Sequence, residues 1–178
     1  MTHGWNSSAC RGLQTFCMLA LMAGCGEEDS TDVQSLSLDT RDPYANAVGP
    51  GSSAVAHEAF QAVGPPDGES AIMLGLLGTS LVLDMGEGEE GTGELSVYYS
   101  GVSIGVVTSV DFLGADGTLL SSGLLHLAKI RGGKQVTHVP YPSAPTPYRY
   151  VRIRGLLAVP YAIDAVEAAS IVAPPSAL

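Results

Sequence analysis

The segment of sequence that decides the fold is YRYVRIR, residues 148–154. Side chains at alternate positions of an extended chain point to opposite faces. One face therefore carries Tyr148, Tyr150, Arg152 and Arg154, and the other carries Arg149, Val151 and Ile153. Aromatic and β-branched residues in this alternation predict a β-strand, so the chain should contain further strands that pair with it.

Four further short runs predict strands, at residues 80–85, 94–99, 108–113 and 161–168. Asp116-Gly117, just after the third run, is a strong signal for a tight turn. The 178-residue chain is long enough for one domain with a sizeable core, and its 22 glycines and 11 prolines favour turns over long helices. We therefore predict an all-β domain, a sandwich or a barrel, at residues 42–172, and a disordered tail at residues 173–178.

The N-terminal part has the features of an export signal. A largely apolar stretch at residues 13–24 is too short to span a bilayer, which takes ~20 residues, but it suits the apolar region of a signal peptide. The sequence LMAGC at residues 21–25 resembles the bacterial lipobox, which implies a covalent lipid on Cys25 and cleavage before it. We expect a signal peptide at residues 1–24 and an acidic, disordered tether at residues 25–41. Gly26 resembles the default for outer-membrane lipoproteins.

Cysteine position and charge restrict the class of protein further. Cys10, Cys17 and Cys25 all lie in the expected signal region, so the domain has no thiol for an internal disulfide. The formal net charge of -10 argues against nucleic acid as a partner. Most acidic side chains precede residue 117 and most basic ones follow it. We expect strands from the two parts to pair and neutralise each other.

An ordered series of short segments resembles discoidin-type, galactose-binding-like jelly-roll domains of bacterial surface proteins. The segments are residues 44–48 (YANAV), 64–68 (GPPDG), 74–75 (LG), 81–84 (LVLD), 94–98 (ELSVY), 149–153 (RYVRI) and 163–167 (IDAVE). The resemblance implies a jelly roll, which is an antiparallel β-sandwich of two sheets, in agreement with the predicted strands. It also implies binding of carbohydrates, lipids or proteins through loops at one end, and in many members a structural calcium ion.

The resemblance places Asp67-Gly68 near that calcium. It also implies that a late strand supplies one carboxylate ligand, either Asp164 or Glu167. Carboxylate and carbonyl oxygens are the ligands that calcium prefers. The alternative is that Asp67 only initiates its own turn.

Binding of a sugar calls for exposed aromatic side chains. Adjacent residues of a strand face opposite ways, so one of Tyr98 and Tyr99 should be exposed and could bind a ligand; the alternative is that both are core or edge tyrosines.

His57, His126 and His138 are isolated in the sequence, and no catalytic motif accompanies them. We predict a non-catalytic, membrane-anchored binding or adhesion module of the cell envelope, with a glycan or an envelope protein as partner. The alternative is a structural accessory subunit of a larger envelope assembly, for which a broad exposed apolar face would be the sign.

Overall fold

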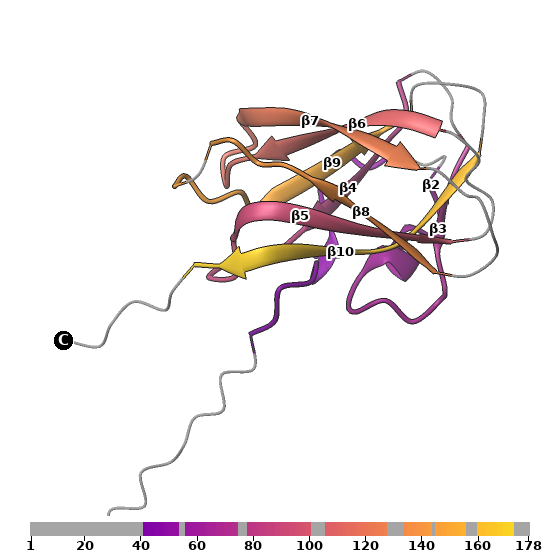
Figure 1. Cartoon of the computed structure of the whole chain (residues 1–178), viewed down its shortest axis with the longest axis horizontal. Coiled ribbons are helices and arrows are strands. Elements are labelled where there is room, and N and C mark those ends of the chain that lie inside the picture. The colour runs from indigo at the N-terminus through magenta and orange to yellow at the C-terminus, as the bar shows by residue number, and fades with distance from the viewer. Residues whose placement is uncertain are drawn as a thin grey trace, which may run out of the picture. The chain divides into compact units, whose positions relative to one another are not determined.

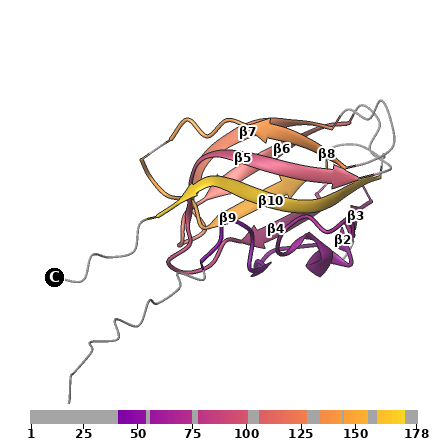
Figure 2. The same ribbon diagram turned by 60° about the horizontal axis from the view of Figure 1, so that its bottom comes forward.

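The computed structural model describes residues 41–53, 56–74, 78–100, 106–127, 134–143, 145–155 and 160–172. In this part of the chain, two five-stranded antiparallel sheets stack face to face (Figures 1 and 2). The predicted all-β antiparallel sandwich is confirmed. The predictions for residues 1–24, for Cys25 and most of the tether, and for residues 173–178 lie outside the described residues.

The first sheet, called sheet I here, has the order β1-β4-β9-β6-β7. Its strands are β1 (Ala47–Val48), β4 (Ser80–Asp84), β9 (Tyr150–Arg154), β6 (Val106–Leu113) and β7 (Leu119–Leu127). The second, sheet II, has the order β2-β3-β10-β5-β8. Its strands are β2 (Ala56–His57), β3 (Ala71–Met73), β10 (Tyr161–Ile171), β5 (Gly91–Ser100) and β8 (Gln135–Val139). A short 3-10 helix, η1 (Ala59–Ala62), precedes β3.

Strand β9 lies in the middle of sheet I, between β4 and β6. Val151 and Ile153 point inward and are fully buried, as their alternation predicts. Tyr150, Arg152 and Arg154 remain partly or largely exposed on the opposite, outer face. The inward apolar side chains of both sheets form one continuous core, which is the main source of stability for a sandwich of this kind.

The prediction for Tyr148 is wrong, because β9 begins only at Tyr150. Tyr148 does not share the outer face; it is fully buried and packs against Phe112 and Tyr141, with ring centroids 4.9 Å away in both cases. Its backbone bridges to Gly91. A Cβ at Gly91 would lie 2.5 Å from the Tyr148 ring, so only glycine permits this approach.

The expected pairing of opposite charges between the two parts of the chain is confirmed. Arg149 Nε lies 3.1 Å from Asp84 Oδ1, and Arg152 and Arg154 both contact Asp111 across the β9–β6 pair. Arg149 therefore does not point inward beside Val151; it is partly exposed and ion-paired. Among the residues described here, no helix has the length and apolar character needed to cross a bilayer.

Candidate functional site

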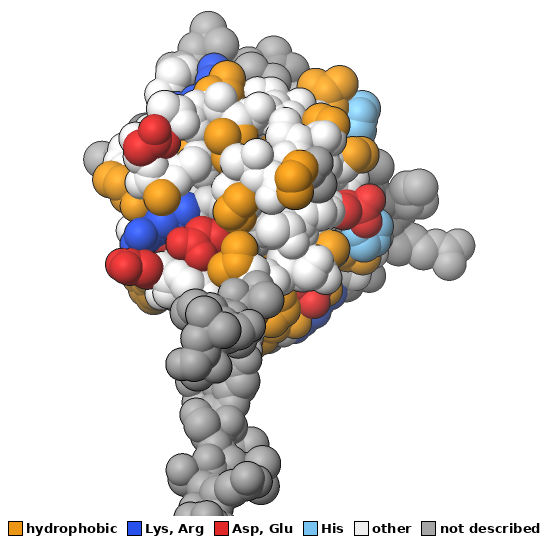
Figure 3. All heavy atoms as spheres, turned by 90° about the vertical axis from the view of Figure 1, so that its left-hand side faces the viewer, with side chains coloured by type: hydrophobic (Ala, Val, Ile, Leu, Met, Phe, Trp, Pro, Cys, Tyr) orange, Lys and Arg blue, Asp and Glu red, His pale blue; other side chains and the backbone are white. Residues whose placement is uncertain are grey.

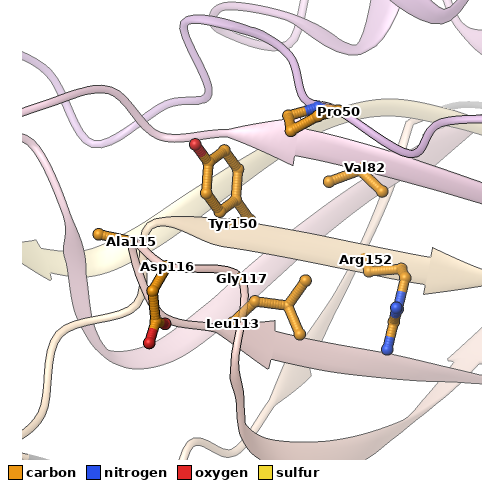
Figure 4. A pocket seen from close by; sticks show the side chains of 8 residues that line it. All are labelled: Pro50, Val82, Leu113, Ala115, Asp116, Gly117, Tyr150 and Arg152. Carbon is orange, nitrogen blue, oxygen red and sulfur yellow. The ribbon is translucent and has the colours of Figure 1, made fainter.

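A shallow cavity of about 280 Å³, the Tyr150 pocket, opens on the outer face of sheet I. Three neighbouring strands supply side chains to it, and two loops complete its wall (Figure 4). The lining residues are Pro50, Val82, Leu113, Ala115, Asp116, Gly117, Tyr150 and Arg152. Register explains the convergence, because Tyr150 pairs with Leu113 and Arg152 pairs with Val82.

The turn at one end of the pocket is fixed by its own sequence. Gly117 has a φ of 78°, and its N–H donates to the carbonyl of Gly114 at 2.9 Å. Asp116 Oδ1 accepts hydrogen bonds from the hydroxyl of Thr118 at 2.7 Å and from its N–H at 3.0 Å. These bonds hold the pKa of Asp116 below its usual value. Asp116 is therefore an ionised hydrogen-bond acceptor at this end of the pocket.

A network of hydrogen bonds orients Arg152 at the other end. Asp111 is only 2% exposed. Its Oδ2 accepts from Arg152 Nε at 2.9 Å and from Arg154 Nε at 2.5 Å, and its Oδ1 accepts from Ser122 Oγ at 2.7 Å. Burial alone would raise the pKa of Asp111, but the hydrogen bonds from Ser122, Arg152 and Arg154 outweigh it and lower that pKa.

The pocket thus combines an apolar and aromatic surface with one anionic and one cationic group. The guanidinium of Arg149 lies 5.5 Å from the Tyr150 ring centroid, a cation–π contact that helps to hold the ring. Binding sites for small ligands are built in this way, from apolar lining and a few fixed polar groups. The sequence alone predicts that Tyr150 and Arg152 share one face of a strand and that Asp116-Gly117 forms a turn, but it does not predict that they meet.

Tyr98 and Tyr99 face opposite sides of β5, as predicted. Tyr99 is 3% exposed in the core, so it offers no platform to a ligand. Tyr98 is half-buried on the outer face of sheet II, where its hydroxyl donates to Glu167 Oε2 at 2.5 Å. This hydrogen bond, with burial, raises the pKa of Tyr98 to about 12. Of the two, Tyr98 alone stays a candidate for ligand binding.

The structure brings two of the three predicted calcium ligands together. Asp164 lies at a register shift of β10 and is fully buried, and a bulge of this kind re-aims a side chain. Its Oδ1 accepts the N–H groups of Asp67 and Gly68, at 3.2 and 3.1 Å. The Asp67 carboxylate itself accepts the N–H of Glu69 at 2.8 Å, so Asp67 does stabilise its own turn. Glu167, the third predicted ligand, does not join them; its carboxylate accepts the hydrogen bond from the Tyr98 hydroxyl.

A lysine ammonium, which the sequence did not suggest, faces this pair. Lys134 Nζ donates to the carbonyl of Pro66 at 2.8 Å and lies 3.9 Å from Asp164 Oδ2. Calcium takes six to eight oxygen ligands, whereas no group of three or more candidate metal-binding side chains exists among the described residues. The Lys134 ammonium lies where a calcium ion would have to sit: the Pro66 carbonyl accepts its hydrogen bond, and its charge is paired with Asp164 Oδ2. The residues present here do not fit a calcium ion.

One group on sheet II has the composition of a catalytic triad without its geometry. Ser96 Oγ and Glu94 Oε1 lie 3.1 and 3.3 Å from the same nitrogen, Nδ1 of His138. His138, which is isolated in the sequence, therefore has two polar partners in the structure. In a hydrolase triad the serine and the acid contact different ring nitrogens, so that a proton passes from the nucleophile to the histidine. This group cannot activate Ser96 in that way.

No protein-family model and no curated protein matches the chain. The solved structures that are similar to it include the following three. The lectin domain of lectinolysin complexed with Lewis B antigen has a TM-score of 0.49 at 17% identity, over 73% of this chain and 94% of that one. A Streptococcus pneumoniae fucose binding module has a TM-score of 0.47 at 14% identity, over 71% and 92%. A second such module, SpX-3, has a TM-score of 0.42 at 12% identity, over 76% and 96%. At these identities the likeness concerns the fold alone.

Proposed function

We propose that the chain is a non-catalytic carbohydrate-binding module whose site is the Tyr150 pocket. The observation that carries the proposal is that an aromatic residue, Tyr150, lines the same pocket as the ionised Asp116 and Arg152. A sugar ring has apolar C–H faces that pack on an aromatic side chain. Its hydroxyls donate to carboxylates and accept from guanidinium groups.

The dimensions of the pocket suit one sugar ring. Its volume of about 280 Å³ lies near the lower end of small-ligand sites, which span ~300–1,000 Å³. Because the cavity is shallow, a bound ring keeps much of its contact with water. We expect a single sugar to bind in the millimolar range, about -4 kcal/mol, and longer glycans to bind more tightly through added contacts.

The distribution of apolar side chains favours a binding module over a permanently packed subunit. Large exposed hydrophobic residues come from strands of both sheets, from η1 and from the loop after β3: Val48, Phe60, Ile72, Leu74, Val107, Leu119, Leu124 and Val136. On the face that Figure 3 shows, hydrophobic side chains lie in small patches separated by polar atoms. A permanent interface is usually a broad and more apolar surface.

We further propose that a lipid on Cys25 holds the module on a membrane, with the outer membrane as its site. The lipobox resemblance at residues 21–25 supports the anchor, and the acidic stretch after it suits a solvated tether.

A glycan array tests the binding function. The purified chain should retain a defined set of glycans, and Tyr150→Ala should lose them. Phe60→Ala is the matched control, because it removes an exposed aromatic side chain that does not line the pocket. Retention of no glycan by the folded wild type, or equal retention by wild type and Tyr150→Ala, would contradict the proposal.

A further inference from the structure

Two arginines on the outer face of sheet I share a single counter-charge. The Nε groups of Arg152 and Arg154 both donate to Oδ2 of Asp111, and Arg152 Nη2 also lies 2.8 Å from it. Of all the carboxylates that the structure describes, Asp111 alone lies within 4.0 Å of either guanidinium. The three side chains together therefore carry one unbalanced positive charge.

The unused donors of both arginines face solvent. The side chains of Arg152 and Arg154 are 32% and 45% exposed. Nη1 of Arg152 and both Nη atoms of Arg154 have no partner in the described part of the protein. A guanidinium presents its N–H groups as a rigid fork that fits the paired oxygens of a carboxylate or sulfate. Asp111 fixes both forks through Nε, so little side-chain freedom is lost on binding.

The arginines lie in line with the Tyr150 pocket. Tyr150, Arg152 and Arg154 project from the same face of β9, and a strand advances ~3.3 Å per residue. Arg154 is thus about 13 Å along the strand from Tyr150. The ionised Asp116 lies at the Tyr150 end and repels an anionic group there. Along the site a negative group is followed by an aromatic ring and then by two positive groups. A glycan with one anionic end would therefore bind in one preferred direction.

We infer that Arg152 and Arg154 form a second subsite, which binds the anionic group of an acidic oligosaccharide whose neighbouring ring occupies the Tyr150 pocket. This inference rests on the proposed function. The protein as a whole carries a formal charge of -10, so the subsite acts at short range and attracts no polyanion from a distance. Uronate and sulfate groups share the chemistry that the two guanidinium groups recognise.

Calorimetric titration of the purified chain distinguishes a uronate ligand from a sulfated one. The ligands are an oligogalacturonate, its neutral methyl ester and a sulfated oligogalactan. The acid should bind at least about tenfold more tightly than its ester, which is the usual effect of a charge-assisted hydrogen bond. Preference for the sulfated ligand over the acid would assign the subsite to sulfate. Arg154→Gln should abolish the preference for an anionic ligand, whereas Arg41→Gln, which removes a positive charge elsewhere, should retain it.

The outcomes distinguish this inference from the proposed function. Equal binding of acid, ester and sulfated ligand by the wild type would overturn the acidic subsite and leave carbohydrate binding intact. The subsite is likewise overturned if Arg154→Gln weakens all three ligands equally, or if none binds while an array yields a neutral ligand. If neither the array nor the titrations give binding, the subsite and the proposed function both fail.

Discussion

Lys134 Nζ lies 3.9 Å from Oδ2 of Asp164, a carboxylate whose side chain is fully buried. Oδ2 has no hydrogen-bond partner among the described residues, so the ammonium is the positive charge that compensates it. The same ammonium donates to the carbonyl of Pro66. Three segments distant in sequence thereby meet: the 64–69 turn, the residue before β8, and β10.

Loss of Lys134 should destabilise the protein, because a buried carboxylate would lose its counter-charge. We expect Lys134→Met to lower the free energy of unfolding by about 1–3 kcal/mol, less than for a fully buried pair since half of Lys134 is exposed. Asp164→Asn should cost less in the Lys134→Met background than in the wild type, by about 1 kcal/mol or more. Urea denaturation of the four proteins measures this coupling; strictly additive costs would show that the two residues act independently.

The same geometry predicts that calcium is not needed for stability. The melting temperature of the wild type should be equal in excess calcium and in chelator. Saturating calcium would stabilise the native state by ~2.7 kcal/mol at a hundredfold excess over its dissociation constant. A melting temperature several degrees lower in chelator would therefore contradict this prediction and support the calcium site that the family resemblance implied.

Much of the fold follows from short-range patterns, and the site does so only in part. The alternation of β9 is contained in its own residues, so the burial of Val151 and Ile153 is predictable from them. The burial of Tyr148 depends on Gly91, more than fifty residues away, and no local pattern reports such a contact. The family resemblance predicts that Asp67 and Asp164 lie close together, which the structure confirms. It does not predict that the positive charge beside them is the ammonium of Lys134, from another part of the chain. The Tyr150 pocket likewise depends on which strands become neighbours.

The buried hydroxyl of Tyr148 should reduce stability. It has no hydrogen-bond partner in the described structure, and its burial raises its pKa. Tyr148→Phe should leave the ring packing intact and raise the free energy of unfolding by about 1 kcal/mol. Tyr161→Phe is the matched control: its hydroxyl donates to the Arg154 carbonyl at 3.0 Å, so its loss should cost about 1 kcal/mol. Chemical denaturation measures both, and an equal loss in the two variants would contradict this account.

Asp111 should make stability depend on pH in the acid range. The pKa of Asp111 is lowered in the folded protein. The ionised carboxylate therefore contributes its full stabilisation above its pKa in the unfolded chain, ~3.9, and this stabilisation is lost as the pH falls through its lower pKa in the folded protein. The difference in unfolding free energy between wild type and Asp111→Asn should therefore be largest near neutral pH and shrink below about pH 4. Urea titrations from pH 7 to pH 2 measure it. A difference that stays constant across this range would show that the Asp111 charge does not contribute.

Membrane attachment should depend on one thiol. Cys25→Ser should leave an uncleaved or soluble precursor, because serine cannot accept the thioether-linked lipid. Fractionation of cells into membrane and soluble parts, with metabolic labelling by a fatty acid, measures this. Partition of the serine variant with membranes to the same extent as the parent would remove the proposed anchor.

The central claim is that a sugar binds on the outer face of sheet I, and mapping of amide chemical shifts tests it most directly. Titration of the ¹⁵N-labelled chain with the glycan selected by the array should shift the amides of Leu113, Ala115, Asp116, Gly117, Tyr150 and Arg152, which line the Tyr150 pocket. The amides of residues 96–98 on sheet II should stay unchanged. Shifts confined to sheet II around Tyr98, with the Tyr150 pocket unaffected, would contradict the account.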